Sequence, residues 1–273
     1  MYDFNAFVKQ VRDYYAQHKR DFSWRKNINP YRIVVSEIML QQTQTDRVKD
    51  KFEQWMVRFP DFNMLAQASV RDVIVAWSGL GYNRRALALY ELAGRIQREC
   101  NGQLPNDPAQ LVMFKGIGPN TAGSICAFAF NMPTVFIETN IRAVYIHHFF
   151  SSQFHDPGVK ISDKQLLPLI QQTLDRENPR EWYYALMDYG VKLKKEHKNP
   201  NRKSKHHTVQ SRFEGSERQI RGEILKALGA YGQLSFEELS LIIAREPRRI
   251  ENNVSDLIAE GFIKSNNGIY CLA

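Results

Sequence analysis

A short glycine-rich stretch, FKGIGPNTAGS at residues 114–124, constrains the fold of this 273-residue chain more than any other feature. Asp107 and Pro108 before it are typical of a helix start, and the residues after them keep helical spacing. Gly118 and Pro119 begin a second helix in the same way. The pattern is therefore helix, tight turn, helix. A dinucleotide-binding fingerprint needs a strand before its glycines, so the stretch does not indicate that class of site.

The turn itself favours an anionic ligand. Main-chain N–H groups at the start of its second helix face outward and carry the positive end of the helix dipole. No side chain of the turn specifies the ligand, so the repeated phosphates of a DNA backbone fit best. The alternative is an ordinary tight corner between two helices, which the bare glycine pattern also fits.

The charge of the chain favours the same class of partner. There are 37 Lys and Arg against 29 Asp and Glu, a formal net charge of +8. Residues 192–205, KLKKEHKNPNRKSK, hold seven basic residues and one acidic residue. Such a run either contacts a polyanion or serves as a solvated linker, and both interpretations stay open.

The cysteines and the hydropathy of the chain indicate the cellular compartment of the protein. Cys100, Cys126 and Cys271 are odd in number and widely spaced, which fits free thiols in a reducing compartment. The N-terminal residues lack the apolar segment of a signal peptide, and no stretch approaches the apolar length of a membrane span. We therefore expect an intracellular protein, cytoplasmic or nucleoid-associated, with no membrane partner.

Helical periodicity dominates the chain and strand-like runs are scarce. The spacing predicts helices over 4–18, 30–44, 47–58, 63–68, 70–78, 83–99, 107–114, 119–130, 139–150, 163–174 and 181–192. The basic run then marks a boundary. Residues 213–273 read as three helices and a hairpin around Asn-Asn-Gly, which resembles a winged helix-turn-helix. Its arginines Arg245, Arg248 and Arg249 fit DNA binding, and protein docking is the alternative.

Several motifs in order resemble one family. LVMFKGIGPNTAGSICAFAF followed by VFIETNIRAV is similar to the helix-hairpin-helix and downstream carboxylate of the HhH-GPD DNA glycosylase superfamily. NPYRIVVSEIMLQQTQTDRV, FPDFNMLAQAS and VIVAWSGLGYNRRALAL resemble its MutY-type adenine glycosylase branch, and the likeness runs from about Phe22 to Gly190. The resemblance implies an all-α, two-lobed glycosylase fold over 1–207. A barrel lobe would span about 29–133, and the second lobe 1–28 and 134–207, followed by the small winged-helix-like α+β domain.

A glycosylase of this branch needs a general acid that protonates the adenine ring, and the resemblance implies Glu37. Its helical neighbours at three and four residues are Ile33, Val34, Leu40 and Gln41. Three of these four are apolar, and apolar surroundings favour the protonated carboxyl. Without the resemblance, an exposed helix carboxylate would be the simplest interpretation.

A second carboxylate is expected near C1′ of the sugar, where positive charge develops. The matching residue is Glu138, where relatives carry Asp, so its carboxylate must be held differently. Asn140 matches the family and would hold that carboxylate or the sugar-phosphate. The alternative role of Glu138 is to cap the helix that follows it. The extra methylene leaves open a working site, an altered substrate or a weakened enzyme.

The reaction type depends on residue 120. Bifunctional relatives place a lysine there, whose amine attacks C1′ and then cleaves the strand through a Schiff base. Asn120 cannot form that adduct, so we expect a monofunctional glycosylase without β-lyase activity. The adenine-type relatives carry Tyr or Ser at this position, which makes Asn120 unusual.

The resemblance also implies the groups that hold DNA. Gln42 and Tyr82 match residues that enter the duplex and fill the gap around the opposite base. The remaining DNA-binding candidates belong to the same motifs: Gln41, Thr43, Leu80, Gly81, Lys115, Gly116, Ile117, Gly118, Asn120 and Thr121. The main-chain carbonyls of Val112, Phe114 and Ile117 occupy the places where such hairpins often bind Na⁺ or K⁺.

Two features of relatives are missing. Four cysteines that ligate an iron–sulfur cluster usually follow the ALMDYG helix, but three cysteines cannot supply four thiolates. We expect no cluster and no other cofactor, and the basic run 192–205 occupies the corresponding place. His197, His206 and His207 lack the spacing of a zinc site and read as ordinary solvated histidines. Asp188 is expected to cap or pair. The C-terminal domain that reads 8-oxoguanine in relatives is replaced by residues 213–273.

These observations predict a base excision repair enzyme. It would remove adenine opposite 8-oxoguanine or G from double-stranded DNA, with the flipped base between Glu37 and Glu138. We expect a monomer that hands its product to downstream repair proteins. One alternative is a mismatch glycosylase for T or U on the same scaffold. The other is a DNA-binding damage sensor without catalysis.

Overall fold

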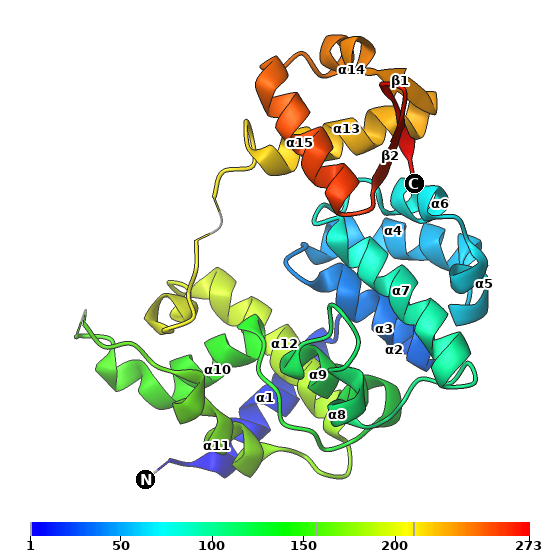
Figure 1. The fold of residues 1–273 in the computed structure, drawn as a ribbon. Helices are drawn as coiled ribbons and strands as arrows, with labels where there is room; N and C mark the ends of the chain where they lie inside the picture. The colour runs from blue at the N-terminus through cyan, green and yellow to red at the C-terminus, as the bar shows by residue number, and fades with distance from the viewer. Residues whose placement is uncertain (1, 157, 210) are drawn as a thin grey trace. The chain divides into compact units, whose positions relative to one another are not determined.

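The computed structural model describes residues 2–156, 158–209 and 211–273 (Figure 1). Contacts divide the chain into two compact units. Unit 1 holds Met1–Ile33, Asn106–Met113 and Ile117–Val209, and unit 2 holds Val34–Pro105, Phe114–Gly116 and Gln210–Ala273. This division by contacts is not the division into lobes implied by the resemblance, which remains a prediction.

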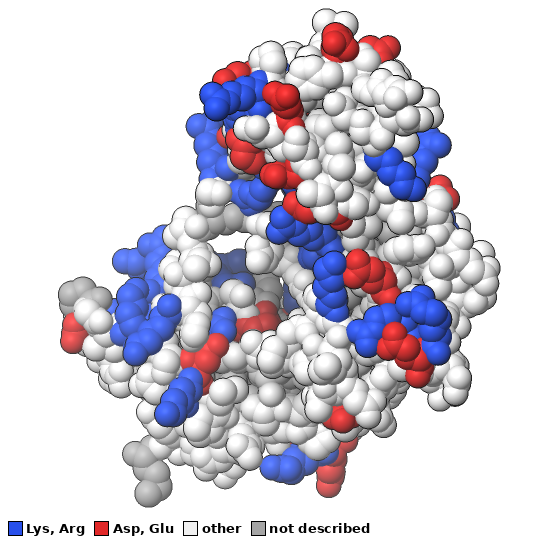
Figure 2. All heavy atoms as spheres, in the orientation of Figure 1, with Lys and Arg blue, Asp and Glu red and all other residues white. Residues whose placement is uncertain are grey.

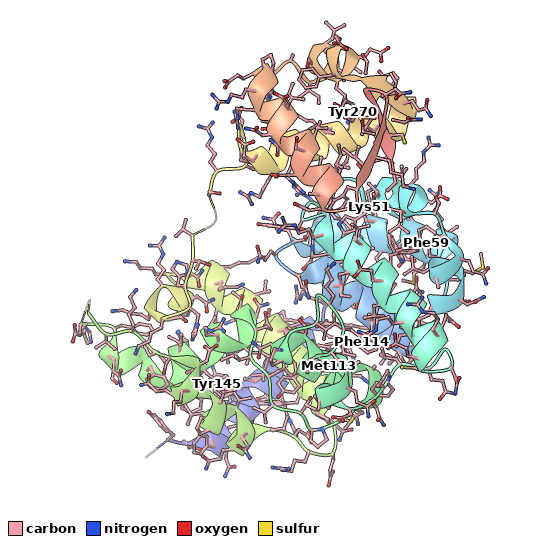
Figure 3. The ribbon with its side chains drawn as sticks, in the orientation of Figure 1. Lys51, Phe59, Met113, Phe114, Tyr145 and Tyr270 are labelled. Atoms are coloured by element: carbon pink, nitrogen blue, oxygen red, sulfur yellow. The ribbon has the colours of Figure 1, made fainter. Side chains whose placement is uncertain are left out.

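Unit 1 is helical. Its helices are α1 (Phe4–His18), α2 (Ser23–Lys26), α8 (Pro108–Leu111), α9 (Pro119–Phe130), α10 (Thr139–Phe150), α11 (Asp163–Thr173) and α12 (Pro179–Glu196). Two 3-10 turns, η1 (Ser151–Gln153) and η2 (Pro200–Lys203), complete it. Helix α10 lies in the centre of its hydrophobic core, where the fully buried Tyr145 packs near Trp182 of α12 and Phe7 of α1 (Figure 3).

The basic run 192–205 is not a solvated linker. Its first residues extend α12, and the remainder folds back onto unit 1 through η2. Asn201 is buried and donates its side-chain amide to the carbonyl of Thr139 at 2.9 Å. Ile161 and Ser204 form a bridge, with Lys205 N donating to the Ile161 oxygen at 2.8 Å. Figure 2 shows Lys and Arg gathered over this end of α12 and the turn after it.

Unit 2 begins with the part of α3 (Pro30–Leu40) that starts at Val34. Its other helices are α4 (Thr45–Arg58), α5 (Phe62–Gln67), α6 (Val70–Trp77), α7 (Arg84–Glu99), α13 (Glu217–Tyr231), α14 (Phe236–Ile243) and α15 (Pro247–Ala259). Local capping sets several of the starts. Asp61 accepts from Met64 N at 2.8 Å before α5, and Ser235 and Glu238 form a capping box before α14.

Residues 211–273, called the C-terminal segment below, contain every strand found among the described residues. These are β1 (Gln233–Ser235), β2 (Ile263–Asn266) and β3 (Ile269–Leu272), in an antiparallel sheet of order β1-β3-β2. The three helices and the terminal hairpin are as predicted, whereas β1 was not. Three residues paired with a distant strand leave little signal in the local sequence.

Contacts join the C-terminal segment to α6 within unit 2. Ile74 of α6 belongs to the hydrophobic core formed by α13, α14 and α15. A Cβ at Gly229 of α13 would lie 3.2 Å from the Val75 side chain, so the two helices pack closely. Arg84 of α7 also forms a two-pronged ion pair with Glu260, at 2.6 and 2.9 Å. The segment is therefore packed against the rest of its unit rather than tethered to it.

Candidate catalytic residues and nucleic-acid interface

Glu37 lies in the central, largely buried part of helix α3. Between Val34 and Met39, every described side chain except that of Glu37 is buried, and Glu37 is half-buried. Apolar neighbours flank it, as the sequence predicted. A carboxyl on such a helix can exchange a proton with a ligand while apolar groups surround its base.

The residues predicted to enter the duplex share an unusual backbone. Gln42 has φ +56° and Tyr82 has φ +48°, the left-handed region that residues other than glycine seldom adopt. Gln42 lies in the turn after α3 and Tyr82 in the turn before α7. Left-handed non-glycine residues persist where the surroundings hold them, and they cluster at functional sites.

Arg85 supplies those surroundings, and the sequence did not single it out. Its side chain is buried and its Nη2 donates to the Thr43 hydroxyl at 2.9 Å. The guanidinium also donates to five main-chain oxygens at 2.6–3.3 Å. Two lie at the end of α3 and three in the two turns: Ile38, Met39, Gln41, Leu80 and Gly81. No carboxylate pairs with it in the described part of the chain. Burial lowers the pKa of Arg85 to about 10, so it stays charged at neutral pH.

The glycine-rich hairpin forms as expected, with a shorter first helix. Asp107 caps α8 by accepting from Ala109 N at 2.9 Å, but α8 ends at Leu111 instead of residue 114. Gly116 has φ +84°, and a Cβ there would lie 3.0 Å from the Ala88 side chain. The turn therefore requires glycine at position 116. The residues that form this turn are not part of α8, so the helix is shorter than predicted. Gln41 donates to the Gly116 carbonyl at 3.2 Å.

Gly118 differs from Gly116 in its backbone conformation and in its surroundings. It is the N-cap of α9 with φ −85°, Pro119 follows at the first helical position, and the prediction for this helix start is confirmed. A Cβ at Gly118 would meet nothing within 4 Å. Neither strain nor packing against the residues that the structure describes accounts for this glycine. Open space at a helix N-terminus is suited to the close approach of an anion.

Glu138 is the N-cap of α10. Its Oε1 accepts from the main-chain N–H groups of Asn140 and Ile141 at 2.8 and 2.9 Å, and its Oε2 accepts from the Asn140 amide at 3.1 Å. The capping role considered from the sequence is therefore present. Asn140 contacts the carboxylate, as the resemblance implied. These hydrogen bonds fix the carboxylate in one orientation without removing its charge.

Two more residues of unit 1 position this carboxylate. Asn120, exposed in the first turn of α9, accepts from Ile137 N at 3.1 Å and so fixes the residue before Glu138. Lys194 of α12 lies near enough to interact with Glu138. Burial lowers the pKa of the Lys194 ammonium, and the Glu138 charge acts in the opposite direction.

Helix α12 approaches the Glu138 cap through Gly190. A Cβ at Gly190 would lie 2.6 Å from the Asn140 carbonyl oxygen, a distance that backbone cannot relieve. Two residues earlier in α12, Asp188 is 2% exposed and pairs with Arg25 through two hydrogen bonds of 2.9 Å. Arg20 adds a hydrogen bond of 2.7 Å from its Nε. The pairing expected of Asp188 is therefore observed.

The residues present do not fit an iron–sulfur cluster. Cys100 follows the last residue of α7, Cys126 is buried in α9 and Cys271 lies in β3. Three thiols cannot supply four ligands. Among the described residues, no group of three or more His, Cys, Asp or Glu side chains is arranged to hold a metal ion. The Na⁺ or K⁺ site at the carbonyls of Val112, Phe114 and Ile117 stays a prediction. Likewise, no described helix has both the length and the apolarity needed to cross a bilayer.

The remaining DNA-binding candidates lie in these same turns. Leu80 is buried and its carbonyl binds Arg85, while Lys115 is exposed and pairs with Glu91 at 3.2 Å. Thr43 and Gly81 are bound by Arg85, and Thr121 lies in the first turns of α9. Glu37 belongs to unit 2 and Glu138 to unit 1.

A glycine hairpin before a helix and a half-buried glutamate upstream of it define the helix-hairpin-helix class of DNA repair proteins. The sequence pattern of the HhH-GPD superfamily base excision DNA repair proteins matches residues 35–169. The chain belongs to this superfamily.

Comparisons with individual proteins agree. The chain is 32% identical over 191 residues to an adenine DNA glycosylase of Buchnera aphidicola, covering 68% of this chain and 52% of the relative. It is 36% identical over 180 residues to the adenine DNA glycosylase of Mycobacterium tuberculosis, covering 65% and 58%. It therefore spans little more than half the length of these relatives. A thermostable thymine-DNA glycosylase shares the fold, with a TM-score of 0.62 and 22% identity over 69% of this chain and 86% of that one.

Proposed function

We propose that this protein is a monofunctional DNA glycosylase of base excision repair, which hydrolyses the bond between adenine and its sugar opposite 8-oxoguanine or G. The half-buried Glu37, with buried residues on both sides of it between Val34 and Met39 of the matched segment, is the observation that carries the proposal. The names of the relatives at 32% and 36% identity support adenine as the base.

Glu37 acts in this proposal as the general acid. Departure of adenine leaves electrons on the base, and a proton delivered to a ring nitrogen neutralises them. The buried apolar residues Val34, Val35 and Ile38 beside Glu37 provide surroundings that favour the protonated form of a carboxyl. Once the bond is broken, the resulting carboxylate accepts a proton from the attacking water.

Glu138 acts through its negative charge. As the N–C1′ bond breaks, the sugar becomes an oxocarbenium ion, which a fixed carboxylate stabilises. The three hydrogen bonds from Asn140 and Ile141 hold the Glu138 carboxylate in place before substrate arrives. Lys194 balances part of this charge from α12. A longer side chain than Asp therefore serves here because the helix cap fixes it.

Asn120 determines that the reaction ends at base release. Its amide nitrogen is not nucleophilic, so no Schiff base with the sugar forms at this position. Its observed contact, the hydrogen bond from Ile137 N, gives it a positioning role instead. The product is then an intact strand with an abasic site, which downstream repair proteins must process.

The DNA backbone is held without a cofactor in this proposal. The N-terminus of α9 at Gly118 receives a phosphate, and Gln42 and Tyr82 enter the duplex from turns held by Arg85. The folded basic run 192–205 adds positive charge next to α12. We propose that the protein binds double-stranded DNA as a monomer inside the cell.

A single-turnover assay on labelled duplexes tests the proposal. The panel contains A opposite 8-oxoguanine, G and C, together with G·T, G·U and undamaged pairs, each with and without alkali. We expect strand breaks at adenine only after alkali. Breaks without alkali, or an enzyme–DNA adduct trapped by borohydride, would contradict the monofunctional reaction. Release of T or U instead would overturn the substrate, and tight binding without any release would leave a damage sensor.

A further inference from the structure

The peptide group between Thr139 and Asn140 is bound at both of its ends. Its N–H donates to the Glu138 carboxylate at 2.8 Å, and its carbonyl accepts from the side-chain amide of Asn201 at 2.9 Å. A peptide group is planar and rigid, so a contact that fixes the carbonyl also fixes the direction of the N–H. Asn201 therefore orients one of the groups that hold the Glu138 carboxylate.

Asn201 is itself held in place. It is 4% exposed and lies in η2, which packs against α10 (Figure 1). Its main-chain N–H donates to the Asn199 side chain at 3.1 Å, and its carbonyl accepts from Ser204 N at 2.9 Å. Further along the same turn, Ile161 N donates to the Lys203 oxygen at 2.7 Å. The side-chain amide is thus presented to α10 from a turn that several hydrogen bonds fix.

Helix α12 also contacts the start of α10. Gly190 approaches so closely that a Cβ there would lie 2.6 Å from the Asn140 carbonyl oxygen. Lys194 comes one helical turn later and shares the face of Gly190. Burial lowers the pKa of the Lys194 ammonium, and the charge of Glu138 acts in the opposite direction, so the two groups lie near each other. Contacts from α12 and from η2 thus converge on the residues that hold the Glu138 carboxylate.

The residues that make these contacts follow the helix at which relatives usually bind an iron–sulfur cluster. The three thiols of this chain lie elsewhere, after α7, in α9 and in β3. In their place, the stretch after α12 is anchored on the start of α10 by a side-chain amide and by close packing at a glycine. Neither contact needs a metal ion.

We propose that Asn201 is a positioning residue for the Glu138 carboxylate, which it fixes through the peptide group between Thr139 and Asn140. The folded run 192–205 then serves this carboxylate as well as the DNA backbone. The inference rests on the proposed function in one respect, because it takes Glu138 as the carboxylate that stabilises the sugar cation.

Hydrogen exchange tests the positioning without any substrate. Asn201→Leu keeps the approximate size of the side chain and removes the donor to the Thr139 carbonyl. It also removes Oδ1, which is buried without a protein partner among the described residues, so the variant should stay folded. We expect the N–H groups of Asn140 and Ile141, followed by NMR, to exchange roughly 10-fold faster. Those of α11 should keep their rates, and unchanged exchange at the start of α10 would overturn the inference.

Excision measures what the positioning does for the reaction. At saturating protein, Asn201→Leu should slow single-turnover excision roughly 10-fold, since a displacement of about 1 Å at a reacting group can cost on the order of 10²-fold. The Kd for a duplex that carries a tetrahydrofuran abasic analogue should stay unchanged. The control is Gln10→Leu, which removes an amide donor to the Tyr189 hydroxyl in the same unit and should leave the rate unchanged. Weaker DNA binding by Asn201→Leu with a normal rate would overturn the inference.

A double-mutant cycle separates positioning from a general contribution to folding. If Asn201 acts through the Glu138 carboxylate, Asn201→Leu should slow excision much less in the Glu138→Gln background than in the wild type. Equal effects in both backgrounds would contradict positioning. Because hydrogen exchange needs no reaction, a wild-type protein that releases no adenine, together with faster exchange in Asn201→Leu, would refute the proposed function alone.

Discussion

The Arg85 guanidinium donates to the main-chain oxygen of Gln41 at 2.6 Å, and this hydrogen bond links α7 to the turn that presents Gln42. The same guanidinium binds the Gly81 carbonyl at 2.9 Å, next to Tyr82. Two turns whose sequences are separated by about forty residues therefore share one buried cation. Their left-handed residues are fixed relative to each other before any ligand arrives.

Arg85→Lys should destabilise the protein and slow excision together. A lysine has three donors on one nitrogen and cannot serve five main-chain oxygens, so several buried carbonyls would lose their partners. We expect a loss of about 2–4 kcal/mol in the free energy of unfolding, measured by urea denaturation. The control is Arg95→Lys, whose pair with Glu99 lies on the surface, so this variant should unfold at nearly the same urea concentration as the wild type. Similar losses of stability in both variants would argue against Arg85 as the group that holds the two turns together.

Asp188→Asn should lower the stability of the protein more than the same substitution in an ion pair on the surface. Asp188 and Arg25 form a buried pair, and removing the carboxylate charge leaves Arg25 buried without compensation. We expect a loss of roughly 3–5 kcal/mol in the free energy of unfolding. Asp13→Asn breaks an exposed pair with Lys9 and serves as the control. A loss at Asp188 no larger than that control would contradict the buried ion pair.

Substitutions at Glu138 should separate its charge from its capping role. Glu138→Gln keeps an oxygen that accepts from Asn140 and Ile141 but removes the negative charge near C1′. Single-turnover excision should fall about 10²- to 10³-fold, while the free energy of unfolding falls by only about 0.3–1 kcal/mol. Glu138→Asp keeps both charge and cap and should retain most of the excision rate. A Gln variant as active as the wild type would assign Glu138 to structure alone.

His148 should make the stability depend on pH. Burial lowers its pKa from the ordinary value of 6.5 to about 4, with the Tyr189 hydroxyl 3.2 Å from its Nε2. Between these values the unfolded chain binds a proton that the folded chain does not, so stability is lost as pH falls from 6.5 towards 4. His148→Leu should reduce the loss between pH 7 and pH 5 by about 1 kcal/mol, allowing for partial exposure. Denaturation curves at both pH values measure it, and an unchanged difference would contradict the buried neutral histidine.

Local signals determined how much of the fold could be predicted. The bounds of α9 and α10 agree with the sequence analysis to the residue, because Gly118, Pro119 and Glu138 mark their starts through local chemistry. Helix α12 extends at both ends beyond the predicted 181–192, since Pro179 suits its first position and lysine favours helix at its end. Helix α3 ends at Leu40 instead of residue 44 because the next turn is held by Arg85.

The residues that could not be identified from the sequence make contacts with residues far away in the chain. Arg85 stands in NRRALAL like any helix arginine, and its burial depends on two turns that meet only in the folded unit. Arg218 is a similar case, because it donates a hydrogen bond to the hydroxyl of Tyr82, which is far away in the chain. A sequence motif can indicate which residues face a ligand, whereas the groups that hold those residues are set by tertiary contacts.

Direct detection of the released base is the measurement closest to the central claim. A duplex with A opposite 8-oxoguanine is incubated with excess protein, and free adenine is quantified by chromatography for the wild type and for Glu37→Gln. We expect free adenine from the wild type and a loss of about 10²-fold or more in the variant. Equal release by both proteins, or no adenine from the wild type while the duplex stays bound, would contradict it.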